Sequence, residues 1–326
     1  MADMMKAIAT TADTPLSLQD IARPKAGAGE VLIAIKAAGL NRADLLQRRG
    51  LYPPPKGAPE TMGLECAGVI SDVGAGVTWW SVGDRVCALL AGGGYAEAVA
   101  VDEGSILPLP DGLDFVQGAC LAEAMMTVYA NVFQRCNLSE GETFLCQGGT
   151  SGIGVMAIQM AKLAGAGTVM ATAGSAGKCE LITQLGGDVA INYREEDFAE
   201  VASARGGADV ILDMVGGDYV AKHLDIIKLN GRICNIAYQN GSEVTLNLMR
   251  LMLKRAILTG TTLRARTAAE KREIRDAVEH QFWGHLQAGR IKTVVDSTFP
   301  LADAEAAHQK MSQGGHSGKI ILVVDG

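Results

Sequence analysis

The sequence predicts an α/β protein in which a β-rich first domain is followed by a doubly wound parallel sheet. Three observations carry this prediction. Short β-prone runs, broken by glycine and proline, fill about the first 100 residues. From Thr143 onward, strand and helix patterns alternate, as they do in a parallel sheet with helices on both faces. A glycine-rich turn separates strand from helix at the start of that series.

Composition is that of an ordinary globular protein. The 326 residues suffice for two domains with their own cores, and 48% of them are hydrophobic. The net charge of −7 and the lack of a strongly basic segment argue against a nucleic-acid partner. No apolar run reaches the roughly 18 residues of a membrane helix. The start M-A-D-M-M-K also lacks the basic character of a secretory signal.

Cysteine usage indicates a reducing compartment. The seven cysteines are an odd number and include no C-x-x-C pair, so neither a disulfide framework nor a thiolate zinc site is expected. Reduced thiols fit a cytosolic protein. We therefore expect a cytoplasmic protein without a membrane partner.

The first domain is predicted to be all β, with two loops of interest. The loops cover 40–46 and 50–56. Three prolines after Tyr52 hold the second loop extended and give it no N–H groups for a ladder, so Tyr52 is either presented at a cleft or a plain surface aromatic. The expected strands are 31–37, 67–73, 82–89 and 95–101.

A helical pattern over 114–134 closes the β region, and we place the domain boundary near residue 124. Six strands are then expected, the number that a full dinucleotide-binding unit requires. They are 143–147, 168–172, 188–192, 208–213, 231–237 and 256–261.

The last 60 residues are too few for a third domain, so they are expected to return to the first domain and complete it. They contain a helix (268–286), a strand (293–298), a helix (301–311) and a strand (319–324). The predicted organisation is therefore 1–124, 125–265 and a C-terminal return, 266–326.

The glycine turn predicts a phosphate site. Gly148, Gly149, Gly152 and Gly154 follow the strand at once, and a glycine-free helix pattern comes next. Such a turn leaves the first N–H groups of the helix unpaired at the positive end of its dipole, which suits a diphosphate. The spacing is G-x-x-G-x-G and not the usual G-x-G-x-x-G, so an ordinary loop is the alternative.

The end of the second strand predicts which dinucleotide binds. It lies about 20 residues past the glycines, where an NAD site carries Asp or Glu for the ribose 2′-hydroxyl. This chain has Gly174, Ser175 and Lys178 there, and its first acid is Glu180. A hydroxyl and an ammonium suit a 2′-phosphate, which a carboxylate would repel. We expect NADPH in preference to NADH; the alternative is that Lys178 is a solvated helix lysine.

Several motifs that are weak alone are specific together. They are A-A-G-L-N-R-A-D-L-L-Q-R-R-G-L-Y (37–52), G-L-E-C-A-G-V-I (63–70), V-G-D-R-V (82–86), G-I-G-V-M-A-I-Q-M-A-K (152–162), A-G-S-x-x-K (173–178), I-N-Y-R-E-E-D-F (191–198) and G-K-I-I-L (318–322). Through them the chain resembles, over essentially its whole length, the zinc-free quinone oxidoreductases of the medium-chain dehydrogenase/reductase superfamily, the zeta-crystallin-like group.

The resemblance implies a GroES-like β domain plus a Rossmann domain, a cleft between them, NADPH as cofactor and two-electron reduction of quinones. It implies that Asn41 and Thr127 lie beside the nicotinamide and that Tyr52 faces the substrate. The expected diphosphate site is Ser151, Gly152 and Ile153, and the expected 2′-phosphate site is Gly174, Ser175, Lys178 and Tyr193. The rest of the implied cofactor wall is Val215, Gly216, Tyr238, Leu263, Arg264 and Lys319.

No metal is expected. The zinc-binding alcohol dehydrogenases of this superfamily use a cysteine and a Gly-His-Glu motif, whereas this chain has Asp44 near the first position and Gly63-Leu64-Glu65 at the second. An isobutyl group cannot coordinate zinc. Residues 88–119 contain no cysteine, so the structural zinc lobe is missing as well. The five histidines have no spacing suited to zinc and are expected to be surface or packing residues.

Without a Lewis acid, oxidation of a plain alcohol should be poor. A quinone accepts hydride readily, so the protein needs only to position the reactants, with Tyr52 as the candidate for orienting the substrate. An enone or enoyl-thioester reductase is the alternative, and an NADPH-binding scaffold or redox sensor with little turnover is a second one. A homodimer is expected, because in this fold the late strand, here 256–261, often pairs across a twofold axis.

Overall fold

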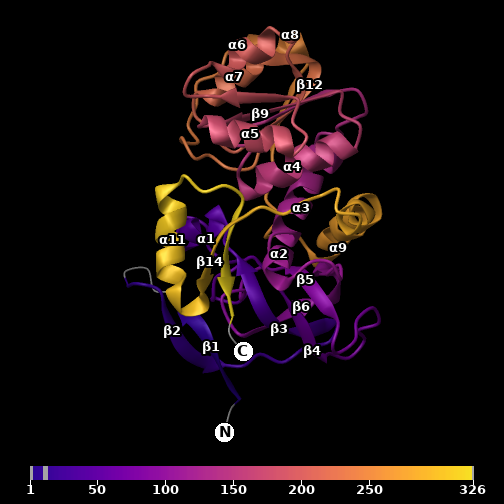
Figure 1. Ribbon diagram of the computed structural model, residues 1–326, viewed down its shortest axis with the longest axis vertical. Helices are drawn as coiled ribbons and strands as arrows, with labels where there is room; N and C mark the ends of the chain where they lie inside the picture. The colour runs from indigo at the N-terminus through magenta and orange to yellow at the C-terminus, as the bar shows by residue number, and fades with distance from the viewer. Residues whose placement is uncertain (1–2, 10–13, 325–326) are drawn as a thin grey trace. The chain divides into compact units, whose positions relative to one another are not determined.

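The computed structural model describes residues 3–9 and 14–324 (Figure 1). Met1 and Ala2 of the N-terminal segment considered above lie outside the described residues. The chain divides into two compact units, of which the first is Met1–Met126 with Arg264–Gly326 and the second is Thr127–Leu263. The C-terminal segment thus belongs to the first unit. The boundaries expected near residues 124 and 265 each lie two residues from these divisions.

The second unit is built on a six-stranded parallel sheet with the order β10-β9-β8-β11-β12-β13. The chain builds outward from β8 in one direction, returns, and builds outward from β11 in the other, which is the doubly wound order of the Rossmann fold. Ligands bind such sheets where the order reverses, here at the carboxyl ends of β8 and β11. The strands are β8 (Thr143–Cys146), β9 (Thr168–Ala173), β10 (Val189–Asn192), β11 (Ala208–Asp213), β12 (Ile227–Asn235) and β13 (Ile257–Gly260).

Helices cover this sheet, which is why its central strands are almost continuously apolar. Leu145, Met170, Ile211 and Ile233 are fully buried and belong to one core cluster. The helices are α4 (Gly152–Leu163), α5 (Ala176–Gln184), α6 (Phe198–Ser203), α7 (Tyr219–Ile226) and α8 (Leu248–Lys254), and a π-helical turn, η2 (Tyr129–Arg135), precedes β8.

The first unit contains a seven-stranded sheet with the order β14-β15-β3-β4-β5-β7, in which β6 also pairs with β3, and a separate hairpin of β1 and β2. The C-terminal strand β15 pairs antiparallel with β3, with Ile321 opposite Gly39. The strands are β1 (Met4–Ala9), β2 (Ser17–Ala22), β3 (Glu30–Gly39), β4 (Glu65–Val73), β5 (Arg85–Leu89), β6 (Ala98–Asp102), β7 (Ile106–Pro108), β14 (Val295–Pro300) and β15 (Lys319–Val323).

One predicted loop is a helix. Residues 40–46 were expected to form a loop, but α1 spans Arg42–Arg48. The helix begins at a capping box, in which the Asn41 N–H donates to Asp44 Oδ2 at 2.8 Å. An N-cap residue followed three positions later by an acid is a helix-start signal, and N-R-A-D carries it here.

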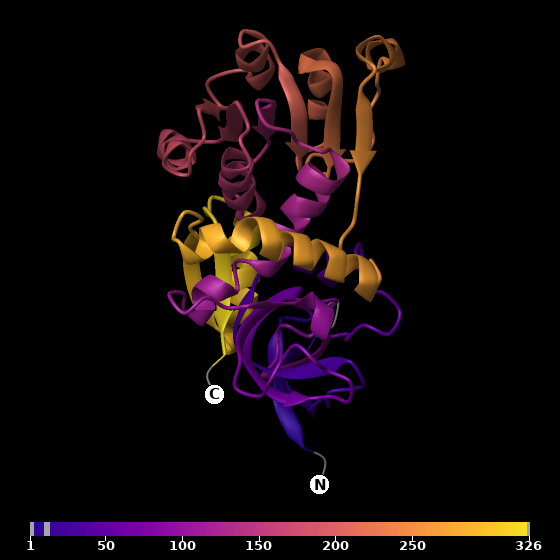
Figure 2. The same ribbon diagram turned by 90° about the vertical axis from the view of Figure 1, so that its right-hand side faces the viewer.

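The helix predicted over 114–134 is also wrong in part, because it divides into α2 (Phe115–Gly118), α3 (Ala122–Val128) and η2. Gly118 packs so tightly on the sheet that a Cβ there would lie 2.7 Å from Leu109 Cδ1. By contrast, α9 (Ala268–Val278) runs on through the π-helical turn η3 (Glu279–Trp283) and α10 (Gly284–Gln287) as one rod (Figure 2). The remaining elements are η1 (Glu103–Ser105), η4 (Leu301–Asp303) and α11 (Ala304–Gln313).

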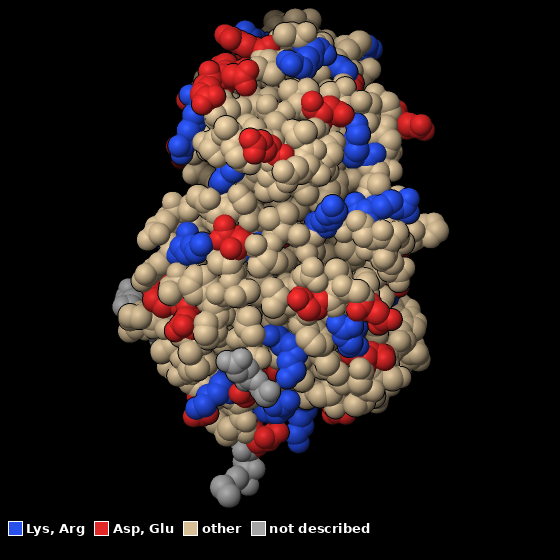
Figure 3. All heavy atoms as spheres, viewed as in Figure 1, with Lys and Arg blue, Asp and Glu red and all other residues tan. Residues whose placement is uncertain are grey.

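Charged side chains of both signs are interspersed on the face drawn in Figure 3, without a large patch of one sign. Within the described residues, every helix is too short or too polar to cross a membrane.

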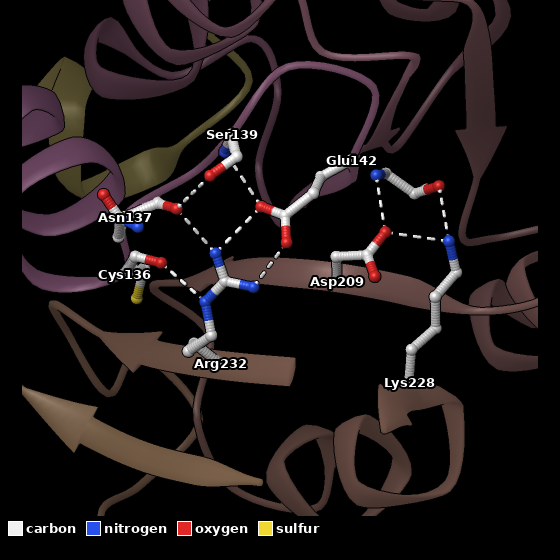
Figure 4. Close-up of polar contacts among 8 residues, drawn as sticks. Cys136, Asn137, Ser139, Glu142, Asp209, Lys228 and Arg232 are labelled. Atoms are coloured by element: carbon white, nitrogen blue, oxygen red, sulfur yellow. Dashed lines mark hydrogen bonds and ion pairs between the residues drawn. The ribbon is translucent and has the colours of Figure 1, made fainter. Parts of the chain in front are cut away.

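Arg232 ties β12 to the segment that precedes β8 (Figure 4). Its guanidinium donates to Cys136 O at 2.6 Å and to Asn137 O at 2.7 Å, and it pairs with the Glu142 carboxylate at 2.7 Å. Burial alone would raise the pKa of Glu142, but the hydrogen bonds from Arg232 and the Ser139 N–H lower it below its usual range. These contacts hold the end of η2 against β12.

Candidate functional site

The glycine turn lies at the carboxyl end of β8, where the sheet order reverses. Gly148 has a φ of +74°, which favours glycine. A Cβ on Gly154 would lie 2.3 Å from Gly148 O, so only glycine allows the helix to approach the turn this closely. Ser151 closes the turn, because its hydroxyl donates to Gly148 O at 2.8 Å and accepts from Gly154 N at 3.0 Å.

Helix α4 presents N–H donors at this turn. Ser151 is its N-cap, and the N–H groups of Gly152 and Ile153 find no acceptor in the described part of the chain. Unpaired donors at the positive end of a twelve-residue helix suit an anion. The three residues expected to hold a diphosphate therefore lie together and fit that group.

The residues expected at a 2′-phosphate surround the carboxyl end of β9. Gly174 follows the strand, and a Cβ there would lie 2.5 Å from the Tyr193 hydroxyl, so these two residues are in contact. Ser175 is the N-cap of α5, and Lys178 lies in its first turn. Tyr193 follows β10 and is 46% exposed. The cluster offers hydroxyl and ammonium donors and fits a phosphate group.

Asp213 fixes the loop after β11. Its carboxylate accepts from Val215 N at 2.8 Å, from Gly216 N at 3.1 Å and from Asn235 Nδ2 at 2.6 Å. Burial raises the pKa of Asp213, and these hydrogen bonds oppose the rise. Tyr238 packs on the same loop, since a Cβ on Gly216 would lie 2.8 Å from its ring. Val215, Gly216 and Tyr238 are thus brought together.

Sequence reasoning missed a buried network that joins the glycine turn to this loop. Thr172 Oγ1 accepts from Gly148 N at 3.0 Å and donates to Gln147 Oε1 at 2.9 Å. The Gln147 amide contacts His223 Nε2 at 3.0 Å, and His223 Nδ1 lies 3.7 Å from Asp213 Oδ2. Burial lowers the pKa of His223 to about 3, so its ring is neutral. The sequence signal that could have indicated this network is the presence of polar residues at the ends of apolar strands.

Thr127 and Leu263 lie at the two sequence ends of the second unit and are both buried. The carbonyl of Thr127 accepts from Asn131 Nδ2 at 2.8 Å. The expected place of Thr127 and Leu263 beside a cofactor stays a prediction.

In the first unit, Asn41 and Lys319 are in direct contact. Lys319 Nζ donates to Asn41 Oδ1 at 2.8 Å and forms a buried ion pair with Glu65 Oε1. Asn41 Nδ2 donates to the same Glu65 oxygen at 3.0 Å, and Glu123 N donates to the other at 3.1 Å. Glu65 was expected only as the remnant of a zinc motif. It is fully buried, and it holds both predicted cofactor residues in place.

Asp44 is held by a second buried set. Its carboxylate accepts from the Tyr95 hydroxyl at 3.0 Å, and that hydroxyl lies 3.2 Å from His308 Nε2. Burial raises the pKa of Asp44 to about 6, against the opposing effect of the hydrogen bonds from Asn41 N and Tyr95. All three side chains are buried, so this set ties α1 to the C-terminal helix α11.

Arg264 holds the loop that carries Tyr52. Its buried guanidinium donates to Ala91 O at 2.7 Å, to Gln47 Oε1 at 2.8 Å and to Tyr52 O at 3.2 Å. It also lies 5.4 Å from the centre of the Tyr52 ring. Tyr52 is therefore half-buried against a cation and is not a plain surface aromatic.

The described residues hold no group of three or more His, Cys, Asp or Glu side chains close enough to bind a metal ion. Four of the five histidines have a ring nitrogen that is buried: His223, His285, His308 and His316.

Comparison with known proteins gives two matching family models. The model described as alcohol dehydrogenase GroES-like domain matches residues 27–111, and the model described as zinc-binding dehydrogenase matches residues 185–322. A quinone oxidoreductase from Rattus norvegicus is 32% identical over 319 residues, which cover 95% of this chain and 94% of the rat protein.

Two solved structures share the fold of this protein over nearly its whole chain. An alcohol dehydrogenase superfamily protein from Novosphingobium aromaticivorans has a TM-score of 0.86 at 29% identity, covering 99% of this chain and 100% of its own. The CurK enoyl reductase has a TM-score of 0.84 at 27% identity, with the same coverage of 99% and 100%. From its matched domains, its full-length relative and its fold, the chain belongs to the zeta-crystallin-like group of the medium-chain dehydrogenase/reductase superfamily.

Proposed function

We propose that the chain is an NADPH-dependent quinone oxidoreductase that transfers hydride without a metal ion. It belongs to an oxidoreductase family that binds a nicotinamide cofactor, NAD or NADP, and its rat relative is named a quinone oxidoreductase. The observation that carries the proposal is the pair of anion-binding features at the carboxyl ends of β8 and β9. One is the turn with the free N–H groups of Gly152 and Ile153, and the other is the donor cluster around Gly174.

The donor set around Gly174 favours NADPH over NADH. Ser175, Lys178 and Tyr193 bring two hydroxyls and an ammonium, whereas an NAD site needs a carboxylate for the ribose. In this proposal Ser151, Gly152 and Ile153 hold the diphosphate, and Val215, Gly216 and Tyr238 complete the wall on the β11 side.

When bound, the cofactor supplies the hydride. The residues of the first unit then position the reactants and neither accept nor donate electrons themselves. Lys319 and Glu65 fix the amide of Asn41, because each of its polar atoms already has a buried partner. Arg264 fixes the backbone of Tyr52 and lies against its ring, while burial raises the pKa of the Tyr52 phenol and keeps it a hydrogen-bond donor.

The donor chemistry at the former zinc motif supports a metal-free reaction. Leu64 has no ligand atom, and the Glu65 carboxylate is neutralised by Lys319. The histidine position of the zinc motif is thus apolar, and the acid beside it is already paired with a protein ammonium. Quinone reduction needs no Lewis acid, because the hydroquinone anion is aromatic and delocalised.

An enone or enoyl-thioester reductase is the second candidate, and the likeness to the CurK enoyl reductase favours it. It would use the same fold, the same cofactor and the same hydride, delivered to the carbon β to a carbonyl. A cofactor-binding scaffold or redox sensor with little turnover is the third candidate. It predicts tight NADPH binding with no cofactor oxidation on any acceptor.

Turnover on three acceptors tests the proposal. With NADPH, we expect oxidation of the cofactor by an ortho-quinone or a para-quinone to be faster than by an enone, measured as loss of absorbance at fixed acceptor concentration. A chelator should leave the rate unchanged. Inactivity on both quinones with turnover of the enone would select the second candidate, and a rate abolished by the chelator would refute the metal-free mechanism.

Lys178 tests the cofactor preference. Lys178→Ala should weaken NADPH binding roughly 10- to 150-fold and leave NADH binding almost unchanged, because a charge-assisted hydrogen bond contributes about 1.5–3 kcal/mol. Titration calorimetry with both cofactors measures the difference. Lys162→Ala is the matched control, since Lys162 lies on α4 and is paired with Asp188 at 2.6 Å. Equal losses for NADPH and NADH would contradict the role of Lys178.

Glu65 tests the positioning network. Glu65→Gln leaves the Lys319 ammonium buried without its counter-charge, so we expect the free energy of unfolding to fall by about 3–5 kcal/mol. The double variant Glu65→Gln/Lys319→Met should recover most of that stability, because it removes the stranded charge. It should still raise the KM for NADPH, since Asn41 loses a partner that orients it.

Urea unfolding and steady-state kinetics separate these two effects. A single variant as stable as the parent chain, or a double variant less stable than the single one, would show that the ion pair does not hold this site together.

We also propose that the chain forms a homodimer through the edge strand β13 and the neighbouring helix α8. Ile257 on β13 is 55% exposed and Leu253 on α8 is 67% exposed, and Leu248, Met249 and Met252 are exposed beside it. An edge strand with unpaired N–H and C=O groups next to apolar side chains favours pairing with a second copy.

Light scattering tests whether this surface forms the dimer. The parent chain should have the mass of a dimer, and Leu253→Glu should shift it toward the monomer, because a carboxylate is costly to bury there. Val82→Glu, at an apolar residue that is 61% exposed in the first unit, is the control and should stay dimeric. A monomeric parent chain would refute the proposal.

A further inference from the structure

We propose that Cys136 and Cys234 are a redox-sensitive pair of thiols that closes to a disulfide when the protein meets hydrogen peroxide. The pair lies in the second unit and belongs to none of the anion-binding features described above. Cys136 follows η2, and Cys234 lies near the end of β12.

Two independent contacts bring these residues together around Asn131. The Cys136 N–H donates to Asn131 O at 3.0 Å, and Cys234 Sγ donates to Asn131 Oδ1 at 3.1 Å. Arg232 precedes Cys234 by two residues on β12 and so points to the same face of the sheet, and its Nε donates to Cys136 O at 2.6 Å. The two cysteines are therefore neighbours, and proximity is the first requirement for a disulfide.

The surroundings favour a thiolate at Cys136. When Cys136 loses its proton, the Cys234 S–H can turn from Asn131 Oδ1 to the Cys136 sulfur. That hydrogen bond lowers the pKa of Cys136, burial opposes this, and the guanidinium groups of Arg232 and Arg135 lower it further. Glu142 acts in the opposite direction, but its charge is paired with Arg232. The Arg232 side chain is fixed beside Cys136 by its bond to Cys136 O (Figure 4). Cys234, by contrast, has a raised pKa and keeps its proton.

The other buried cysteines lack these features. Cys66 and Cys87 lie on the paired strands β4 and β5, where Cys66 is opposite Ala88 and Cys87 is opposite Ala67. Because neighbouring positions on a strand point to opposite faces, these two thiols leave the sheet on different sides. Burial also raises the pKa of both. They provide an internal control of similar burial.

The chemistry balances with peroxide as the oxidant. The Cys136 thiolate attacks one peroxide oxygen, so that an S–O bond forms, the O–O bond breaks and hydroxide leaves. Cys234 sulfur then attacks Cys136 sulfur, so that the S–S bond forms and the S–O bond breaks. The departing hydroxide and the protons end as water. Two thiols and one peroxide give one disulfide and two waters; sulfur is oxidised and peroxide is reduced.

Disulfide formation would affect Thr127, a predicted cofactor residue, through Asn131. It removes the S–H donor to Asn131 Oδ1, and Asn131 Nδ2 holds the Thr127 carbonyl. Thr261 Oγ1 still donates to Asn131 Oδ1 at 2.6 Å, so the contact is weakened and not abolished. This consequence, unlike the disulfide itself, rests on the proposed function.

Peptide mapping tests the disulfide directly. The folded protein is treated with peroxide, alkylated, and digested without reductant by trypsin and a glutamate-specific protease. We expect the loss of two hydrogens per chain and a linked peptide that joins residues 136–140 to residues 233–243. Cleavage after Glu140 and Glu142 separates Cys136 from Cys146, so the link is assigned without ambiguity. Dithiothreitol should restore both thiols.

Variants and the internal control make the result decisive. Cys136→Ser and Cys234→Ser should each abolish the link, while Cys179→Ser, which removes the one half-exposed thiol, should keep it. Full alkylation of both cysteines after peroxide, a sulfinic acid at Cys136 with Cys234 still free, or an equally abundant Cys66–Cys87 link would overturn the proposal. Because the readout is the mass of peptides, it stands even if quinone reduction fails.

Discussion

The buried ion pair between Glu65 and Lys319 is the constraint on which the first unit depends. A carboxylate that is fully buried on β4 needs a counter-charge, and the chain supplies it from β15, 254 positions along the sequence. Pairing of β15 with β3 brings the ammonium to that carboxylate. Gly39 leaves space for this carboxylate, because a Cβ at position 39 would lie 2.6 Å from Glu65 Oε1. The fold and the site therefore depend on each other, because the C-terminal segment must return to the first unit for the Glu65 charge to be neutralised.

The second unit solves a similar problem without an ion pair. Hydrogen bonds run from the glycine turn through Thr172 and the amide of Gln147 to the neutral His223 ring, which packs 3.7 Å from Asp213, whose carboxylate fixes the loop after β11. Polar groups buried beneath a binding turn must be satisfied, and once satisfied they hold the turn rigid. The same network thus lowers the entropy cost of binding a long, flexible dinucleotide.

The sequence predicted the fold more fully than the site. The six-stranded parallel sheet followed from alternating patterns, because periodicity and glycine turns are local signals. The helix α1 was missed although the N-R-A-D capping signal was present. Glu65 and His223 were missed as network members for a different reason. A buried ion pair or hydrogen bond between residues far apart leaves no periodic trace, so the role of a lone acid or histidine becomes visible only in three dimensions.

Perturbed pKa values usually mark catalytic acids and bases, and this molecule has several. Asp44 and His223, however, are already held by partners. Asp44, with a pKa raised to about 6, accepts from Tyr95 and from the Asn41 N–H, and His308 contacts the same Tyr95 hydroxyl. His223, with a pKa near 3, is joined to Gln147. A group locked in this way stabilises the fold and has no free path to a substrate proton. This arrangement agrees with the proposed function, because hydride transfer to a quinone needs accurate placement and no protein acid.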